Sequence, residues 1–197
     1  DQAGNFVVAF KASGATDSDG IYARRFLANG APLGNEFLVN QAASNIQTDA
    51  SIAMAPDGRF VVSWSDNNAK KVGTDSRLEQ DIYTQRFAAN GTKLGSQFLV
   101  HAKSSLPQYH SVAAVDASGN FAVGWGHSDV YGSFVGRLNV QRYSSAGTKL
   151  GSPLAIVSTA VGGGLSLAYD GPGNLIVSWR NLSGDNFGPL VFAQRYD

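Results

Sequence analysis

Short runs of apolar and β-branched residues recur along this chain at a regular spacing. The first run, at 5–10, reads Asn-Phe-Val-Val-Ala-Phe. Related runs follow at 59–64, 120–125 and 174–179. Each copy begins directly after a glycine, and these are Gly4, Gly58, Gly119 and Gly173. The copies are therefore 54, 61 and 54 residues apart. Runs of this composition are typical of β-strands, and a period of this length indicates a repeat fold.

Three further elements recur in a fixed order. The second ends in Arg-Phe or Arg-Tyr and lies at 21–26, 82–87, 138–143 and 191–196. The third opens with Leu-Gly and lies at 33–39, 94–100 and 150–156. The fourth lies at 50–54, 110–114 and 165–169. Asn-Gly pairs separate the second and third elements in two copies, which predicts tight antiparallel hairpins there.

Both faces of the first element are apolar. Phe6 and Val8 point to one side of the predicted strand, whereas Val7 and Ala9 point to the other. A strand that is apolar on both sides must be covered on both sides, so we expect the sheets to stack face to face. The fourth element is rich in alanine and serine, and such small side chains suit the innermost strand beside a propeller axis.

The pattern predicts an all-β protein, a β-propeller-like array of four-stranded antiparallel blades. With the fourth element innermost, the chain contains about 14 strands: two complete blades between two incomplete terminal blades. We interpret 1–197 as one repeat domain with repeats at approximately 1–49, 50–109, 110–164 and 165–197. Unpaired strand edges invite further pairing. We therefore expect a homo-oligomer, a self-closed ring of four or a piece of a longer array, and not an open monomer.

Composition limits the partners. The 15 basic and 15 acidic residues give a net charge of zero, and no basic stripe suited to a phosphate backbone is present, so we expect no nucleic acid. No apolar run is long enough to predict a membrane span. No basic-then-apolar leader precedes Asp1. The chain has no cysteine, which excludes disulfides and thiolate metal sites.

The segments that follow the first element differ most between copies. Variable loops on a regular scaffold usually carry binding residues, and these loops would gather at one end of the blades. They supply our candidate ligand-binding residues: Trp64, Asp66, Trp125, His127, Asp129, Trp179, Arg180 and Asp185. Tryptophan suits stacking on sugar rings. A residue that recurs in register also suits a structural anchor between sheets, and that reading is favoured.

The arginine near the end of the second element recurs in all four copies. Its head group is expected to be partly buried, and a buried charge needs a partner. Carboxylates of the turns before the first element, or backbone carbonyls, are the available partners. The four residues are Arg25, Arg86, Arg142 and Arg195.

One segment resembles a calcium loop. Asp17 and Asp19 stand one residue apart and precede Gly20, which supplies two oxygen ligands and a turn. The full ligand set of a helix-loop-helix calcium site is absent, and Asp-Gly pairs are common in plain turns. Calcium is therefore a candidate metal, and no other cofactor is expected.

The histidines offer little sign of catalysis. The three of them share no metal-ligand spacing. The run 127–129 contains the residue types of a hydrolase triad, but neighbouring residues seldom converge on one atom. Tyr109 and His110 have the residue types of a polysaccharide lyase pair, yet adjacent residues of a strand are expected to diverge.

The repeat resembles a known family. The runs Asp-x-x-Gly-Asn-Phe-Val-Val-x-Trp, Ile-Tyr-x-Gln-Arg-Phe and Leu-Gly-x-x-Phe-x-Val resemble repeats of large exported bacterial surface proteins, often adhesin-like. The resemblance covers essentially the whole chain. It implies an extracellular setting and a binding or scaffolding role, and it carries no catalytic residue.

These observations lead to three hypotheses. The first is a non-enzymatic extracellular binding module whose partner is a glycan. The second is a structural repeat that assembles with itself or with the remainder of a larger surface protein. The third, less favoured, is a propeller glycoside hydrolase or polysaccharide lyase, because a carboxylate pair at catalytic spacing cannot be identified from the sequence.

Overall fold

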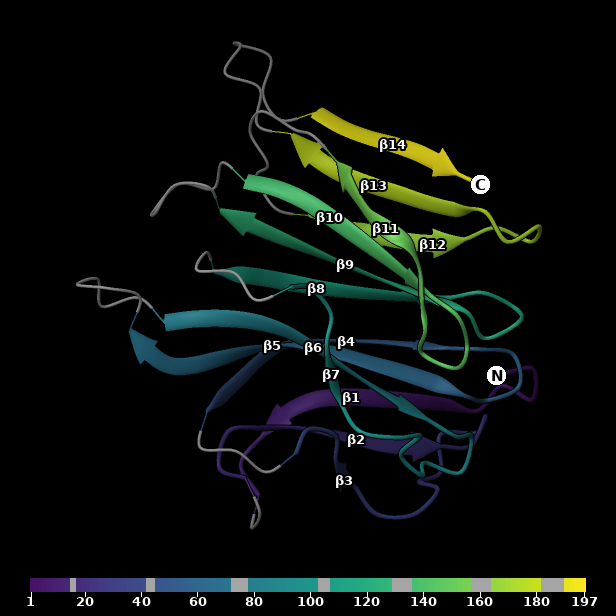
Figure 1. The fold of residues 1–197 in the computed structure, drawn as a ribbon. Coiled ribbons are helices and arrows are strands. Elements are labelled where there is room, and N and C mark those ends of the chain that lie inside the picture. The colour runs from purple at the N-terminus through teal and green to yellow at the C-terminus, as the bar shows by residue number, and fades with distance from the viewer. Residues whose placement is uncertain are drawn as a thin grey trace.

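The computed structural model describes residues 1–14, 17–41, 45–71, 78–102, 107–128, 136–156, 164–181 and 190–197. These residues form 14 strands, and every strand pair is antiparallel (Figure 1). The described part of the chain contains no helix, and so no helix long and apolar enough to cross a membrane. The predicted all-β class and strand number are confirmed.

The strands form four separate sheets, which we number along the chain. Sheet 1 contains β1 (Phe6–Ala12), β2 (Gly20–Phe26) and β3 (Phe37–Leu38). Sheet 2 contains β4 (Ile46–Met54), β5 (Phe60–Lys71), β6 (Leu78–Phe87) and β7 (Phe98–Leu99). Sheet 3 contains β8 (Gln108–Val115), β9 (Phe121–Ser128), β10 (Gly136–Tyr143) and β11 (Lys149–Ile156). Sheet 4 contains β12 (Ser166–Tyr169), β13 (Leu175–Asn181) and β14 (Leu190–Tyr196).

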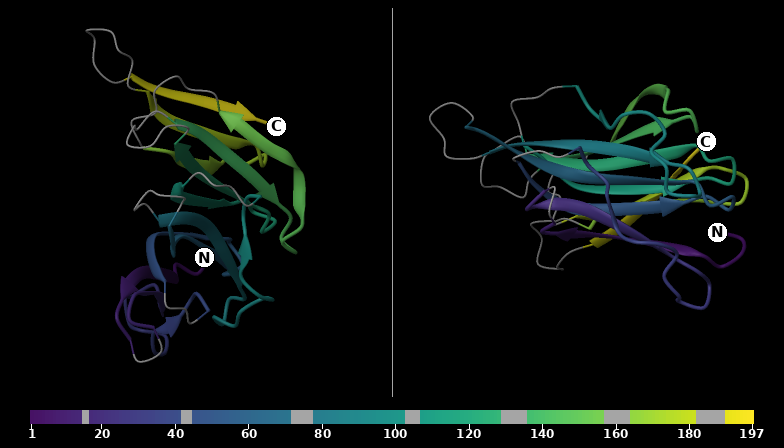
Figure 2. Two further views of the ribbon diagram at one scale, coloured as in Figure 1. Left: turned by 60° about the vertical axis from the view of Figure 1, so that its left-hand side comes forward. Right: turned by 90° about the horizontal axis from the view of Figure 1, so that it is seen from below.

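The sheets are stacked in chain order and the stack is open. Figure 1 shows sheet 1 at one end and sheet 4 at the other, with sheets 2 and 3 between them. The strands β1, β4, β8 and β12 lie along one side of the stack, where β4 contacts both β1 and β8, and β8 contacts β12. The views in Figure 2 show the sheets fanned relative to one another. The small-residue strands are therefore the inner strands, as predicted.

Sheets 2 and 3 pack through both of their faces, and sheets 1 and 4 each pack through one. We call the face toward the preceding sheet the leading face and the face toward the following sheet the trailing face. The leading face of sheet 2 buries Phe60, Val62 and Trp64 against sheet 1. Its trailing face buries Val61 and Ile82 against sheet 3. A third apolar cluster joins sheets 3 and 4. Alternation of two apolar side-chain sets along β5 is therefore the direct cause of the stacking.

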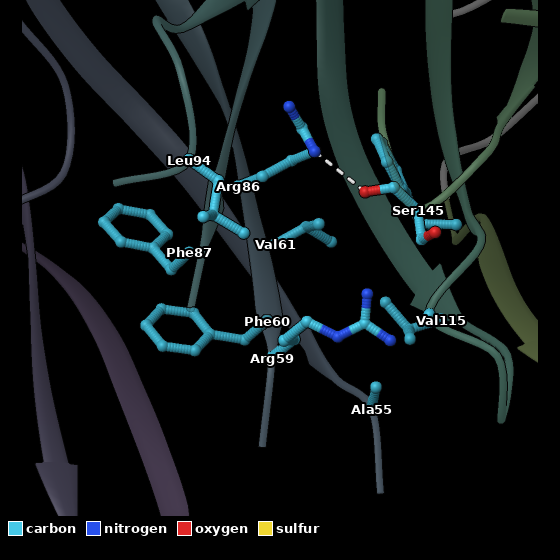
Figure 3. A pocket seen from close by; sticks show the side chains of 11 residues that line it. Ala55, Arg59, Phe60, Val61, Arg86, Phe87, Leu94, Val115 and Ser145 are labelled. Atoms are coloured by element: carbon cyan, nitrogen blue, oxygen red, sulfur yellow. Dashed lines mark hydrogen bonds between the residues drawn. The ribbon is translucent and has the colours of Figure 1, made fainter. Parts of the chain in front are cut away.

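A row of arginines joins neighbouring sheets. Arg25 donates a hydrogen bond from Nη1 to the Ala89 carbonyl at 3.1 Å, and Arg86 donates to the Ser145 carbonyl at 2.8 Å (Figure 3). Arg142 donates to the Asp197 carbonyl in the same way. The acceptors are thus backbone carbonyls of the next sheet. We call each of these arginine–carbonyl hydrogen bonds between neighbouring sheets an arginine clamp. Arg195 instead pairs with Asp170 at 3.1 Å.

The space beside the clamp is small. The pocket in Figure 3 lies between sheets 2 and 3 and has a volume of about 20 Å³, with Phe60, Arg86 and Phe121 among its lining residues. That volume holds little more than one water molecule. The gap therefore belongs to the sheet packing and is too small for an organic ligand.

Equivalent phenylalanines test the stacking. Phe60 is 1% exposed between sheets 1 and 2, whereas Phe6, at the same position of sheet 1, is 42% exposed. Phe60→Ala is expected to lower the free energy of unfolding by about 3–5 kcal/mol, because it leaves a cavity in the core. Phe6→Ala removes mainly the stacking with Phe26 and is expected to cost about 1 kcal/mol. Urea denaturation followed by circular dichroism measures both, and equal losses would contradict face-to-face packing.

Candidate functional site

An open pocket lies along the inner strands. It has a volume of about 530 Å³, and we call it the inner groove. Its walls come from three consecutive sheets, through β4, β8 and the start of β12. The lining residues are Asp49, Ala50, Ser51, His110, Ser111, Val112, Gly164 and Leu165. A concave site of this size that carries a few polar groups is the expected form of a ligand-binding site.

The same β-bulge lies in β4 and in β8 at the groove. The pairing of β4 with β5 shifts between Thr48 and Ser51, and that of β8 with β9 shifts between Tyr109 and Val112. Within these shifts Asp49 has φ 53° and His110 has φ 55°. Gly164 precedes β12 at the equivalent position and has φ 81°. Glycine adopts this left-handed conformation freely, but aspartate and histidine adopt it at a cost. Such strained positions often carry functional side chains.

The observed strand pairing also corrects the sequence alignment of the inner strands. The repeat places Ser51 opposite Ser111 in the alignment. In the structure Ser51 pairs with Ser63, while Val112 pairs with the equivalent Gly124. Ser51 therefore corresponds to Val112, and Asp49 corresponds to His110. A slip of one residue exchanges the two faces of a strand, so the groove residues could not be read from the repeat alone.

Asp49 and His110 form the polar centre of the groove. His110 Nδ1 lies 3.9 Å from Asp49 Oδ2, and the two side chains are 61% and 42% exposed. Ser65 donates a hydrogen bond to Asp49 Oδ2 at 3.4 Å, and Ser111 donates to the Asp49 carbonyl at 3.0 Å. The imidazole is thus open to a ligand and has a carboxylate beside it. This is the arrangement of a group that accepts and returns a proton.

Tyr109 lies against His110, contrary to the sequence expectation. The two rings meet edge to face with centroids 5.3 Å apart. Adjacent residues of a regular strand point to opposite faces, but the left-handed φ of His110 turns its side chain back toward Tyr109. The prediction that these side chains diverge is therefore wrong, and the bulge is the reason.

Arg180 begins beside the same groove. It is exposed, and its Cβ lies 3.6 Å from the point that a Cβ on Gly164 would occupy. It corresponds to Ser65 of sheet 2 and Gly126 of sheet 3, because each follows the tryptophan of its strand. Of the residues predicted to bind a ligand, Arg180 thus lies next to the groove and carries a positive charge.

The predicted tryptophans lie inside the stack. Trp64 and Trp125 are buried, and Trp179 is buried at 9% exposure. Trp64 stacks on Tyr83, and Trp125 Nε1 donates to Gln108 Oε1 at 2.8 Å. Their rings fill the contacts between sheets, so no ring face is open to a sugar. This placement matches the anchor reading and removes the stacking platform that we considered.

His127 and Asp66 lie at the same end of their sheets. Asn139 Nδ2 lies 2.9 Å from His127 Nδ1, so His127 is engaged within sheet 3. Asp66 is buried at the equivalent position of sheet 2. Asp129 and Asp185 lie outside the residues that the structure describes.

Asp66 belongs to a buried acidic cluster between sheets 1 and 2. Its carboxylate accepts hydrogen bonds from Asn45 at 2.9 Å and Gln47 at 3.2 Å. Asp81 is its direct cross-strand partner and is also buried. Burial raises the pKa of Asp66 above its usual value, the two amide hydrogen bonds lower it, and the charge of Asp17 raises it further. Asp66 therefore has the environment of a carboxyl group that holds its proton.

The candidate calcium loop has other partners. Asp19 pairs with Lys11 at 2.9 Å. Asp17 is buried, and its carboxylate accepts from Asn40 Nδ2 at 2.8 Å and from the Asp19 amide at 3.0 Å. Within the described ranges, no three acidic, histidine or cysteine side chains are grouped so as to hold a metal ion. Calcium at Asp17 and Asp19 remains a prediction from the sequence.

A second pocket, at the opposite end of the inner strands, is lined by structural carboxylates. It has a volume of about 440 Å³, and Asp1, Asp116 and Asp170 lie on its wall. Asp116 accepts hydrogen bonds from the backbone and side-chain amides of Asn120, and Asp170 does the same with Asn174. These carboxylates close the turns before β9 and β13. The inner groove is therefore the better candidate site.

Comparison with known proteins identifies the fold. An endo-arabinase from Bacteroides thetaiotaomicron superposes with a TM-score of 0.57 at 16% identity, over 97% of this chain and 71% of that one. An α-L-arabinofuranosidase from Lactobacillus brevis gives 0.58 at 11% identity, over 98% and 64%. An ulvan lyase bound to a saccharide of glucuronate and sulfated rhamnose gives 0.58 at 12% identity, over 99% and 54%. No family model matches the sequence. No curated protein matches it either.

These comparisons correct the functional expectation. The first is one of several β-propeller glycosidases with this likeness, and the third is a polysaccharide lyase. We predicted a non-enzymatic binding or scaffolding module, and that prediction is wrong: the fold is one that carbohydrate-active enzymes use. The sequence repeat reveals the stacked scaffold, which such enzymes share. A site built from different residues in each copy does not appear in the repeat. The chain spans less than two thirds of the arabinofuranosidase and of the lyase.

The raised pKa of Asp66 predicts how stability depends on pH. Between the pKa of the unfolded chain and the higher pKa of the folded protein, the folded state binds more protons. The free energy of unfolding therefore falls as pH rises through this window and stays reduced above it. Asp66→Asn keeps an oxygen acceptor for Asn45 and Gln47 and removes the charge. The variant is expected to melt at a higher temperature than wild type at neutral pH, with no difference below about pH 4.

Asp57→Asn is the matched control. Burial slightly raises the pKa of Asp57, but hydrogen bonds and the charge of Arg59 bring it below its usual value. This variant is expected to show no gain at neutral pH. Calorimetric melting over a pH series compares the two variants, and a neutral-pH gain that persists in acid would contradict the assignment to Asp66.

Proposed function

We propose that this chain forms part of a β-propeller enzyme that cleaves polysaccharide in the inner groove. The observation that carries the proposal is the Asp49–His110 pair, which two strained bulges hold at one open pocket. The fold likeness to arabinanases and to an ulvan lyase supports a carbohydrate substrate. Four stacked sheets also reach the lower end of the blade number of propellers, about 4–8.

His110 is the proposed general base. It is exposed in the groove, and a neutral imidazole nitrogen can accept a proton from a bound substrate. Asp49 stabilises the imidazolium that forms, through the approach of its Oδ2 to Nδ1. A separation of 3.9 Å is long for a hydrogen bond, but such contacts commonly shorten when substrate binds.

The proposed reaction is β-elimination at a uronate residue. His110 takes the proton from the carbon next to the uronate carboxylate, and that electron pair forms a carbon–carbon double bond. The bond between the adjacent uronate ring carbon and the glycosidic oxygen breaks, and this leaving oxygen, still attached to the other sugar, takes up a proton. Arg180, at the edge of the groove, is placed to attract the substrate carboxylate. Tyr109, against the imidazole, is the phenol nearest to donate the proton.

Among the described residues that line the groove, Asp49 is the one carboxylate, which favours elimination. Hydrolysis normally needs two carboxyl groups flanking the bond.

A second candidate is hydrolysis by the acidic cluster. Asp66 holds its proton more tightly than an ordinary carboxyl group, as a general acid must, and Asp81 lies directly opposite. In this alternative the substrate reaches the end of sheets 1 and 2, where both side chains are buried.

An extracellular location follows from the proposed substrate, because a polysaccharide does not cross a membrane unaided. A bound glycan remains the proposed partner.

His110→Gln tests the proposed reaction. A panel of uronate-containing polysaccharides is incubated with the protein, and both new reducing ends and the ultraviolet absorbance of the unsaturated product are followed. The wild type is expected to produce both signals together. His110→Gln is expected to lower the rate at least about 100-fold, since it removes the general base but keeps polar contacts.

Asp57→Asn, at the opposite end of the sheets, is the control and is expected to keep full activity. Reducing ends without the unsaturated product, lost in Asp66→Asn and retained in His110→Gln, would replace elimination with hydrolysis. No cleavage of any member by the wild type would overturn the proposed function.

A further inference from the structure

The two ends of the stack expose faces that are buried everywhere else. The leading face of sheet 1 presents Phe6 and Val8 to solvent, each 42% exposed. The trailing face of sheet 4 presents Val191, which is 78% exposed. The residues equivalent to Val191 in sheets 1 to 3 are Ile21, Ile82 and Leu138, at 0%, 0% and 4%. Single exposed apolar residues are ordinary, but neighbouring apolar residues left open on one sheet face form a candidate interaction surface.

The two open faces repeat the apolar pattern of the buried ones, and each adds one arginine. Arg24 stands where Gln85 is buried in sheet 2, and Arg180 stands where Ser65 is buried. Phe6 stacks on Phe26 with an interplanar angle of 10°, just as Phe60 stacks on Phe87 at 7°. In sheet 2 that aromatic pair is covered by the trailing face of sheet 1. Val191, Ala193 and Arg195 of sheet 4 repeat the pattern of Ile21, Ala23 and Arg25, which does the covering.

At each end of the stack, one of the two partners of an arginine clamp is missing. A Cβ on Gly91 would lie 3.1 Å from Arg25, and one on Gly147 would lie 2.8 Å from Arg86. At the equivalent Gly30 of sheet 1, nothing lies within 4 Å. Sheet 1 therefore has the acceptor turn without an arginine. Sheet 4 has Arg195, exposed and paired within its own sheet to Asp170, without an acceptor turn beyond it.

We propose that a second copy of this chain packs head to tail, with the trailing face of sheet 4 against the leading face of sheet 1 of the other copy. Val191 covers Phe6 and Val8, and Arg195 reaches the turn at Ala28 and Gly30. The chain's three internal interfaces show that such faces fit one another. Because the net charge of the chain is zero, two copies approach each other without overall electrostatic repulsion. This interface is heterologous, because it uses two different faces. Arg180 lies directly opposite Val191, so the sheet 4 side of the interface adjoins the edge of the inner groove.

Aspartate substitutions at the two faces test the proposal. Sedimentation velocity measures the mass of the wild type, Val8→Asp and Val191→Asp over a concentration series, against a chain mass of 20.7 kDa. The wild type is expected to assemble. Each variant is expected to associate at least about tenfold more weakly, because a hydrated carboxylate replaces an apolar side chain in the contact. Both positions are exposed in the single chain, so circular dichroism is expected to show an unchanged fold.

Mixing the two variants distinguishes head-to-tail packing from pairing of like faces. Val8→Asp keeps an intact sheet 4, and Val191→Asp keeps an intact sheet 1. The equimolar mixture is therefore expected to form a complex that neither variant forms alone. Leu33→Asp, at a position 38% exposed away from both faces, is the matched control and is expected to assemble like wild type. A wild type that stays monomeric, or a variant that self-associates while the mixture gains nothing, overturns the proposal.

Discussion

The structure depends on burial of apolar side chains between successive sheets. In β5 the even-numbered side chains Phe60, Val62 and Trp64 pack on sheet 1, and Val61 packs on sheet 3. A single sheet of this kind exposes both of its apolar faces to water, so its stability depends on packing against neighbouring sheets. The stacking in turn fixes where the inner strands β4, β8 and β12 lie, and these strands supply the walls of the inner groove.

Much of this architecture could be predicted because recurrence and alternation report packing directly. The run 59–64 has two apolar faces, and its four copies give the sheets their order. The sequence predicts a carboxylate or a backbone carbonyl as the partner of the recurring arginine. In the structure Arg86 donates its hydrogen bond to a carbonyl of the next sheet. Closure could not be predicted, because it depends on small angles between sheets that no side-chain pattern encodes.

The candidate site was harder to predict than the scaffold. The loop-end tryptophans drew attention because they recur, yet recurrence marked their role between sheets, and Trp64 is fully buried. Asp49 and His110 do not resemble each other, and alignment on the recurring serines places the two strands one residue out of register. The bulge in β8 brings Tyr109 against His110, which the alternation of a regular strand forbids. Among the predicted residues that the structure describes, Arg180 lies beside the groove.

The choice of a main-chain oxygen as the acceptor of the arginine clamp has an evolutionary consequence. Ala89, Ser145 and Asp197 differ in every side-chain property, yet each offers the same carbonyl to an arginine of the preceding sheet. Because the arginine bonds to a main-chain oxygen, the side chain at the acceptor position of the turn can change without loss of the hydrogen bond. The same main-chain acceptor also lets one unit be duplicated, deleted or exchanged with another without redesign of its neighbours. Chains of different length can thus arise from this unit by recombination alone.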